Sequence, residues 1–473
     1  MALPPGFRVA LDPGVRRVDG GTVLIGGAPL RILRLTGGGS RAVDELAGGA
    51  PVGAGPGRQA LARRLLDAGM AHPRPGPSAV SAADVTLVVP VRDRAEGLRA
   101  TLAAAGHGGP VIVVDDGSAV AVAAPSVAPA TVIRHDRSRG PAAARNSGWR
   151  AARTDLVAFV DADCEPAPGW LAGLLPHFGD PAVAAVAPRV TARPGVGAPR
   201  WLADYERVRS PLDRGPREGT VRPGSPVPYV PTAALVLRRS VLQELGGFDE
   251  DLTVGEDVDL VWRLVEAGWT VRYEPSVTVT HPTRSSLGAW VRQRVDYGSS
   301  AAPLRRRHGT AVAPAAMSGW TAGALGLAAG GRPVLGVAVA AGTTALLGPR
   351  LRALDHPGRE ALRLAGKGHL FAGARLAEAV RRAWWPLLAA MAGRSRRARL
   401  VLAAAFLVPG VARRPGAAVL GMVDDVAYSA GVWLGCVRER SAAALVPDLR
   451  TWPGRQPAVA SPSTDTNETI SPG

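Results

Sequence analysis

The pattern of apolar and polar positions along the chain changes near residue 84. From this point, short apolar runs alternate with segments whose apolar residues recur at helical spacing. The apolar runs fall at residues 86–91, 111–114, 131–133 and 156–160, and the helical segments at 96–105 and 141–152. Strands that alternate with helices are typical of a parallel sheet with helical crossovers. The pattern therefore predicts an α/β domain over residues 84–308.

Residues 1–77 follow a different pattern. Two strand-like runs, 22–25 and 30–35, are joined by a Gly-Gly turn signal, and helical spacing appears near 43–46 and from 59 to 69. The prolines between residues 72 and 78 predict a linker. We expect a small α+β, winged-helix-like domain that recognises a peptide. The alternative is a packing module without a ligand.

Beyond residue 309 the composition changes to Ala, Gly, Val and Leu. The nearly uncharged segments 314–330 and 333–348 are each slightly shorter than the ~20 residues that span a bilayer. Arginines at 305–307, and at 350 and 352, would hold both ends of such a hairpin on the cytoplasmic side. The alternative is a pair of Ala-rich helices packed on the preceding domain. We expect a helical, membrane-associated region over 309–455, with interfacial helices around 384–411, and a disordered tail over 456–473.

The charge balance narrows the choice of partners. Net charge is +17, the pI is near 11.3, and the cations are Arg except for Lys367. This balance suits phosphate-bearing molecules or an anionic membrane surface. No nucleic-acid partner is expected, because the arginines are dispersed and no recognition motif accompanies them. Only Cys164 and Cys436 are present, and the N-terminus lacks the pattern of a signal peptide. We expect the chain on the cytoplasmic face of the cell membrane.

Polar residues follow three of the apolar runs. Asp161-Ala162-Asp163 comes after the run at 156–160, and Asp115-Asp116-Gly117-Ser118 comes after the run at 111–114. Arg92 and Asp93 end the run that contains Pro90. Ligands of open α/β sheets bind outside the carboxyl ends of the strands. Paired carboxylates there can hold a divalent cation, although an isolated Asp-x-Asp is usually a solvated loop.

Further along the chain, two segments carry charges at helix starts, and a histidine follows a β-branched run. Arg139 and Arg145 flank the start of the helical segment at 141–152, where they would assist a diphosphate. Glu256 and Asp257 precede an amphipathic helix, for which capping is the plain interpretation. His281 follows the run at 277–280 and is a candidate metal ligand or a structural histidine.

In order and spacing, these motifs resemble the family 2 glycosyltransferases of the GT-A fold over roughly residues 85–290. The resemblance implies a Rossmann-like, mostly parallel sheet and an inverting transfer in which Asp257, beside Glu256, takes the proton of the acceptor hydroxyl. It also implies a divalent metal, Mg²⁺ or Mn²⁺, with Asp163, Asp161 and His281 as its ligands. The nucleotide-sugar donor would be bound by Pro90, Arg92, Asp93, Asp115, Asp116, Arg139, Arg145 and Asp161.

The arrangement of the whole chain is similar to that of the mycofactocin-system glycosyltransferases of actinobacteria. This implies that glucose moves from UDP-glucose onto a redox cofactor derived from a small peptide. Two alternatives stay open: a membrane glycosyltransferase acting on a lipid or cell-wall acceptor, and a non-catalytic scaffold that binds a peptide or a nucleotide sugar. A sugar nucleotidyltransferase is disfavoured because residues 90–94 contain no glycine. The Gln-x-x-Arg-Trp motif of processive synthases is missing from 290–298, which favours a short glycan on a discrete acceptor.

Overall fold

The computed structural model describes residues 1–4, 6–123, 130–411 and 415–451. The described residues fold into two compact units, of which the first comprises residues 1–312 and 410–444. The second comprises residues 313–409 and the chain from 445 onward. The disordered tail expected at 456–473 lies outside the described residues.

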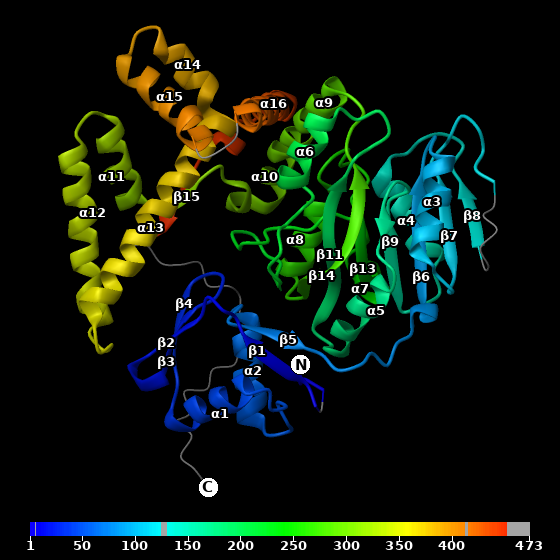
Figure 1. Cartoon of the computed structure of the whole chain (residues 1–473), viewed down its shortest axis with the longest axis horizontal. Helices are drawn as coiled ribbons and strands as arrows, with labels where there is room; N and C mark the ends of the chain where they lie inside the picture. The colour runs from blue at the N-terminus through cyan, green and yellow to red at the C-terminus, as the bar shows by residue number, and fades with distance from the viewer. Residues whose placement is uncertain (5, 124–129, 412–414, 452–473) are drawn as a thin grey trace. The chain divides into compact units, whose positions relative to one another are not determined.

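The first unit is built around a mixed, mostly parallel sheet, in the strand order β10-β14-β11-β13-β9-β6-β7-β8 along its described part (Figure 1). Its strands are β6 (Val85–Val91), β7 (Val111–Asp115), β8 (Ala130–Arg134), β9 (Leu156–Val160), β10 (Glu165–Pro166), β11 (Val183–Arg193), β13 (Ala234–Arg238) and β14 (Thr270–Pro282), with β12 (Gly219–Thr220) beside β14. Strands β9, β6, β7 and β8 run parallel to one another, whereas β13 runs against both of its neighbours. The predicted α/β, GT-A-type architecture is confirmed.

Helices cover both faces of this sheet because successive strand residues point to opposite sides. Leu87 and Val89 of β6 join one hydrophobic core together with Leu98, while Val88 joins the other together with Ala144. The helices of the unit are α3 (Ala95–Ala105), α4 (Pro141–Ala151), α5 (Trp170–Leu174), α6 (Arg200–Arg209), α7 (Arg239–Glu244), α8 (Glu256–Glu266), α9 (Leu287–Ser299), α10 (Ala301–His308) and α16 (Pro415–Arg438).

The N-terminal segment forms its own small α+β arrangement within this unit. Its elements are β1 (Arg8–Leu11), β2 (Arg16–Val18), β3 (Val23–Gly26), β4 (Arg31–Arg34), α1 (Gly37–Ala47), α2 (Pro56–Asp67) and β5 (Ala71–Arg74). Strands β2, β3 and β4 make an antiparallel sheet, and β5 pairs with β1. The linker predicted at residues 72–78 is therefore wrong over its first part. His72 is buried and hydrogen-bonds Asp12 at 2.8 Å, so it belongs to the small core, and Pro73 is tolerated on a short edge strand.

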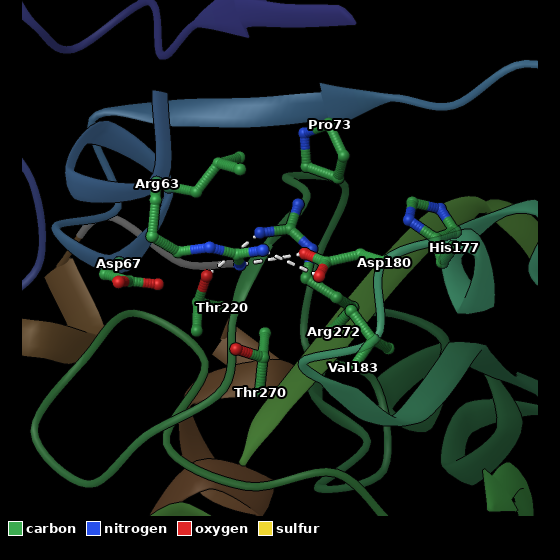
Figure 2. A pocket seen from close by; sticks show the side chains of 10 residues that line it. Arg63, Asp67, Pro73, His177, Asp180, Val183, Thr220, Thr270 and Arg272 are labelled. Atoms are coloured by element: carbon green, nitrogen blue, oxygen red, sulfur yellow. Dashed lines mark hydrogen bonds and ion pairs between the residues drawn. The ribbon is translucent and has the colours of Figure 1, made fainter. Parts of the chain in front are cut away.

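Ion pairs join the N-terminal segment to the beginning of the central sheet (Figure 2). Arg63 of α2 donates two hydrogen bonds to the Asp180 carboxylate, at 2.7 and 2.9 Å. The buried Arg272 of β14 donates to the Thr220 hydroxyl at 2.9 Å and lines the same small pocket. Because this pocket lies at the start of β14, it is far along the strand from His281 and is separate from the polar edge of the sheet.

The second unit is helical over most of its described length. It contains β15 (Ala316–Ser318), α11 (Gly319–Ala329), α12 (Pro333–Leu347), α13 (Pro357–Ala379), α14 (Trp385–Ala392), most of α15 (Arg396–Val411) and β16 (Asp448–Thr451). His369 of α13 bridges α11 and α12, since its ring nitrogens lie 3.1 Å from the Thr321 hydroxyl and 3.2 Å from the Thr343 hydroxyl.

Helix α16 belongs to the first unit, although the sequence boundaries grouped residues 309–455 as one region. Its glycines allow close contact with α9: a Cβ on Gly431 would lie 2.0 Å from the Val295 carbonyl oxygen. The buried Arg294 of α9 pairs with Glu206 and, at 3.1 Å, with Asp424 of α16. Residues 410–444 therefore complete the unit that contains the sheet.

Candidate active site

The carboxyl ends of β9, β6 and β7 meet at one edge of the sheet because these strands are adjacent and parallel. This edge carries the three predicted polar segments that begin at Arg92, Asp115 and Asp161. The segment after β6 is held to the segment after β7: the Asp93 amide donates to the Ser118 hydroxyl at 2.9 Å, and the Asp93 carboxylate accepts from the Ala119 amide at 2.8 Å. The sheet therefore gathers these residues as predicted.

The neighbouring Pro90 and Arg92 occupy different environments at this edge. Pro90 pairs with Val114 inside the sheet. The exposed Arg92 donates from Nη1 to the Ser138 hydroxyl at 3.0 Å, which brings the loop before α4 to the same place. Their assignment to donor binding stays a prediction.

Asp115 is fully buried and its carboxylate is already hydrogen-bonded. It accepts from the amides of Ser118 at 2.9 Å and Val122 at 3.1 Å, and it pairs with Arg134. Burial would raise the pKa of this carboxyl, but these hydrogen bonds outweigh burial and lower it. Asp115 therefore holds the turn after β7 as a carboxylate.

Asp116 has a comparable role toward the loop before α4. Its oxygens accept from His135 Nδ1 and the Ser138 hydroxyl, each at 2.7 Å, and from the amides of Arg139 and Gly140 at 2.8 and 2.9 Å. Burial alone would raise the pKa of Asp116, and the same hydrogen bonds lower it instead. A contact from Asp115 or Asp116 to a nucleotide base stays a prediction, because both carboxylates are engaged within the protein.

Arg145 connects three segments that are far apart in the sequence. From α4 it donates through Nη2 to Asp161 at 2.8 Å and through Nη1 to Glu256 at 2.9 Å. Burial would lower the pKa of this guanidinium, but Asp161 and Glu256 raise it. By contrast, Arg139 is half-exposed and pairs with Glu250 at 2.8 Å. The two arginines predicted to assist the diphosphate therefore lie in different places, and both have carboxylate partners.

Asp257 lies in the first turn of α8, directly after Gly255, whose φ of +89° favours glycine. Burial is the main cause that raises the pKa of Asp257, to about 7, and the negative charge of Glu256 adds to it. The favourable interaction with Arg145 and a hydrogen bond from the Val258 amide at 2.8 Å only partly offset these effects. A carboxylate with a pKa near neutrality is suited to accept a proton under ordinary conditions.

Asp163 and His281 come together through strand pairing. Glu165 of β10 lies opposite Thr280 of β14, so the residues flanking this pair are neighbours, with 3.7 Å between Asp163 Oδ1 and His281 Nε2. Burial is the main cause that lowers the pKa of His281, which favours the neutral imidazole that metals bind. Asp161 instead directs its carboxylate to Arg145.

The fit of a metal to this pair is partial. An oxygen and a nitrogen ligand suit a divalent cation. Within the part of the chain that the structure describes, no group of three or more His, Cys, Asp or Glu side chains is arranged to hold a metal ion. The remaining ligands would therefore be oxygens of a bound phosphate or water.

Two site residues were not predicted individually from the sequence. Arg94, at the start of α3, pairs with Asp163, and its position shortly after the predicted strand was the available signal. Asn146 holds the segment before α8: its amide oxygen accepts from the Phe248 amide at 2.9 Å, and its nitrogen donates to the Phe248 carbonyl at 2.8 Å. Gly247 has no room for a side chain there, because a Cβ would lie 2.5 Å from Asn146 Oδ1.

Comparisons with known proteins agree with this geometry. The family described as "Glycosyl transferase family 2" matches residues 86–246. A pre-mycofactocin glycosyltransferase of Mycobacterium tuberculosis is 44% identical over 95% of this chain and 99% of its own length. The polypeptide N-acetylgalactosaminyltransferase 15 of Mus musculus is 28% identical over 33% of this chain and 26% of its own length. Among solved structures, a mannosyltransferase of Pyrobaculum calidifontis in complex with GDP-Man and Mn²⁺ matches 76% of this chain and 89% of its own, with a TM-score of 0.44 and 17% identity.

Proposed function

Because the chain belongs to glycosyl transferase family 2, we propose that it is an inverting enzyme that moves glucose from UDP-glucose onto a peptide-derived redox cofactor of the mycofactocin type. The acceptor class is supported by the relative that is 44% identical over nearly the whole chain. UDP-glucose as the donor is the expectation that accompanies this resemblance. The observation that carries the chemistry is Asp257, whose pKa burial and Glu256 raise to about 7 at the polar edge of the sheet.

In this mechanism Asp257 acts as the general base. It takes the proton of the acceptor hydroxyl while that oxygen forms a bond to the anomeric carbon of the sugar. The bond from the anomeric carbon to the donor phosphate breaks at the same time, and its electron pair leaves with the nucleoside diphosphate. Arg145 keeps Asp161 and Glu256 in place beside the base, since it donates a hydrogen bond to each.

Asp163 and His281 would hold a divalent cation, Mg²⁺ or Mn²⁺, together with donor phosphate oxygens. Such an ion neutralises the charge that develops on the departing diphosphate. The 3.7 Å between Asp163 Oδ1 and His281 Nε2 supports this proposal, because both atoms can reach one ion of ordinary coordination length with a small adjustment.

The peptide part of the acceptor would be recognised by the N-terminal segment. Strand β4 lies at an edge of the β2-β3-β4 sheet, and Ile32 on it is 40% exposed. An edge strand offers unpaired backbone groups to an added peptide strand. The alternative, a packing module, is favoured by the ion pairs that Arg63 and Arg74 make with Asp180 and Glu218.

We further propose that the second unit attaches to the cytoplasmic face of the membrane. Among the described residues, the helices long and apolar enough to cross a bilayer are Pro333–Leu351 and Gly416–Arg438. Helix α16, which contains the latter, has a buried ion pair to Arg294, so we assign it to the protein core. Helix α11 is about 16 Å long at ~1.5 Å per residue, which is too short to return across the ~30 Å hydrocarbon layer. We therefore prefer peripheral attachment over a transmembrane hairpin at 314–348.

The substitution Asp257→Asn tests the proposed chemistry. We expect kcat to fall by about 10²- to 10⁴-fold, the usual contribution of a general base. Binding of UDP-glucose, measured by calorimetry, should stay within a factor of about two, because the isosteric Asn removes the base without removing a donor contact. Asp251→Asn is the control, since that carboxylate is exposed on the same approach to α8. Turnover within tenfold of wild type would disprove the base assignment, and binding of GDP-mannose in preference to UDP-glucose would disprove the donor.

A further inference from the structure

The arginines around the proposed site differ in whether a carboxylate neutralises them. Arg94 pairs with Asp163, and Arg139 with Glu250. Arg145 pairs with both Asp161 and Glu256. These cations already have acidic partners and are poorly suited to bind a further anion.

Arg284, which follows β14 by two residues, is different. Within the described ranges 6–123, 130–411 and 415–451, no carboxylate lies within ion-pairing distance of its guanidinium, which is half-buried. Its polar contact is with an amide: Nη2 and Nε donate to the Gln293 side-chain oxygen, at 2.9 and 3.2 Å. The Tyr297 hydroxyl lies 3.0 Å from the same Gln293 group. A half-buried guanidinium without a counter-ion is costly unless an anion completes its environment.

The position of Arg284 places it between the proposed metal ligand and the proposed base. It lies three residues after His281, and burial lowers the pKa of that imidazole with a further lowering from Arg284. On the other side, the pKa of Tyr297 is raised by burial and responds to both Arg284 and Asp257. The turn before Asp257 packs on the end of α9: a Cβ on Gly255 would lie 2.9 Å from Ser300 Cβ.

We propose that Arg284 binds the sugar-bearing β-phosphate of the nucleotide donor and that Gln293 and Tyr297 position its guanidinium. The assignment rests on the proposed function for the donor class. The bond that breaks joins this phosphate to the anomeric carbon, so a cation between the metal ligand and the base lies beside the leaving group. A planar guanidinium matches two phosphate oxygens, and it would stabilise the negative charge that grows on the departing diphosphate. This moves the diphosphate-binding cation from Arg139 and Arg145, predicted from the sequence, to Arg284.

The test compares nucleotides that differ by this one phosphate. Affinities for UDP and UMP are measured by calorimetry, with Mg²⁺ and with chelator, for wild type, Arg284→Gln, Arg284→Lys and Arg292→Gln. Arg292 is the matched control because it is an exposed arginine on α9. We expect Arg284→Gln to weaken UDP binding by about 10- to 100-fold, the usual value of a hydrogen-bonded charge, and to leave UMP within about twofold. Lysine should restore part of the UDP affinity because it keeps the charge but not the fork.

Gln293→Ala tests the positioning role with the same readout. We expect a smaller loss, about threefold to tenfold, confined to UDP, whereas a merely structural defect would weaken UMP equally. Unchanged UDP affinity in Arg284→Gln would overturn the assignment alone. So would a raised KM for the acceptor with unchanged UDP affinity, which would make Arg284 an acceptor residue. If wild type binds neither UDP nor GDP, the donor class fails and the assignment fails with it.

Discussion

The substitution Asp257→Asn should stabilise the protein, and the gain should grow with pH. The pKa of Asp257 rises from its ordinary 3.8 to about 7 on folding, mainly through burial and then through Glu256. A carboxyl whose pKa is higher in the folded than in the unfolded protein disfavours folding once the unfolded form ionises. The penalty is therefore absent at low pH, grows between about pH 4 and pH 7, and is constant above.

The magnitude follows from the two pKa values. At about 1.36 kcal/mol per unit, the penalty is about 2 kcal/mol at pH 5 and about 4 kcal/mol at pH 8. Asparagine carries no charge at either pH, and its side-chain oxygen can still accept from the Val258 amide as Asp257 does. For a unit of this size, 1 kcal/mol corresponds to about 1–2 °C in Tm. The variant should therefore melt about 3 °C higher than wild type at pH 5 and about 6 °C higher at pH 8.

The assay is thermal unfolding of wild type and variant across pH 5–8, with chelator and without nucleotide, so that neither ligand changes the protonation of the site. Asp251→Asn controls for the loss of one negative charge, because Asp251 is exposed. We expect its Tm to follow wild type within about 1 °C. A Tm advantage of Asp257→Asn that is the same at both ends of the pH range, or that falls as pH rises, would refute the argument that Asp257 is held in an unfavourable charged state.

The remaining predictions concern the metal and the membrane. Asp163→Ala should weaken UDP binding at least tenfold in Mn²⁺ and leave the weaker binding in chelator unchanged; equal affinities of variant and wild type in Mn²⁺ would show that Asp163 does not hold the ion. Val337→Glu on α12, where the side chain is 68% exposed, should reduce co-flotation with phosphatidylglycerol vesicles severalfold, because it places a charge on the proposed apolar contact surface. The control is Val208→Glu on α6, where the side chain is 77% exposed in the other unit, and equal flotation of the two variants would contradict membrane attachment through α12.

The fold of the sheet could be predicted from the sequence because each strand is a continuous apolar run. Strand β9 extends over Leu156–Val160, as the pattern indicated, and the polar residues that follow β6, β7 and β9 meet because adjacent parallel strands end at one edge. The short strand β10 has no such pattern. It exists because its two residues pair with β14, and this long-range pairing is what brings Asp163 to His281.

The charge pairing at the site could not be predicted from the sequence. Arg145 binds Asp161 and Glu256, which lie 16 and 111 residues away, and no local pattern specifies such partners. The sequence therefore indicated which residues are polar but not which of them neutralise one another. Helix α16 was missed as part of the sheet-containing unit for a related reason: its contact with α9 depends on glycines such as Gly298 and Gly431, which carry no periodic apolar signal.

The return of the chain to the first unit through α16 affects how that unit is made on the ribosome. At about 5–20 residues per second, residue 410 is synthesised roughly 5–20 s after residue 312. During this interval α9 lacks the helix that covers its glycine face, and Arg294 has Glu206 but not yet Asp424. The nascent protein therefore carries an unfinished surface beside the segment that leads to Arg284, and it completes this surface only when nearly the whole polypeptide has emerged.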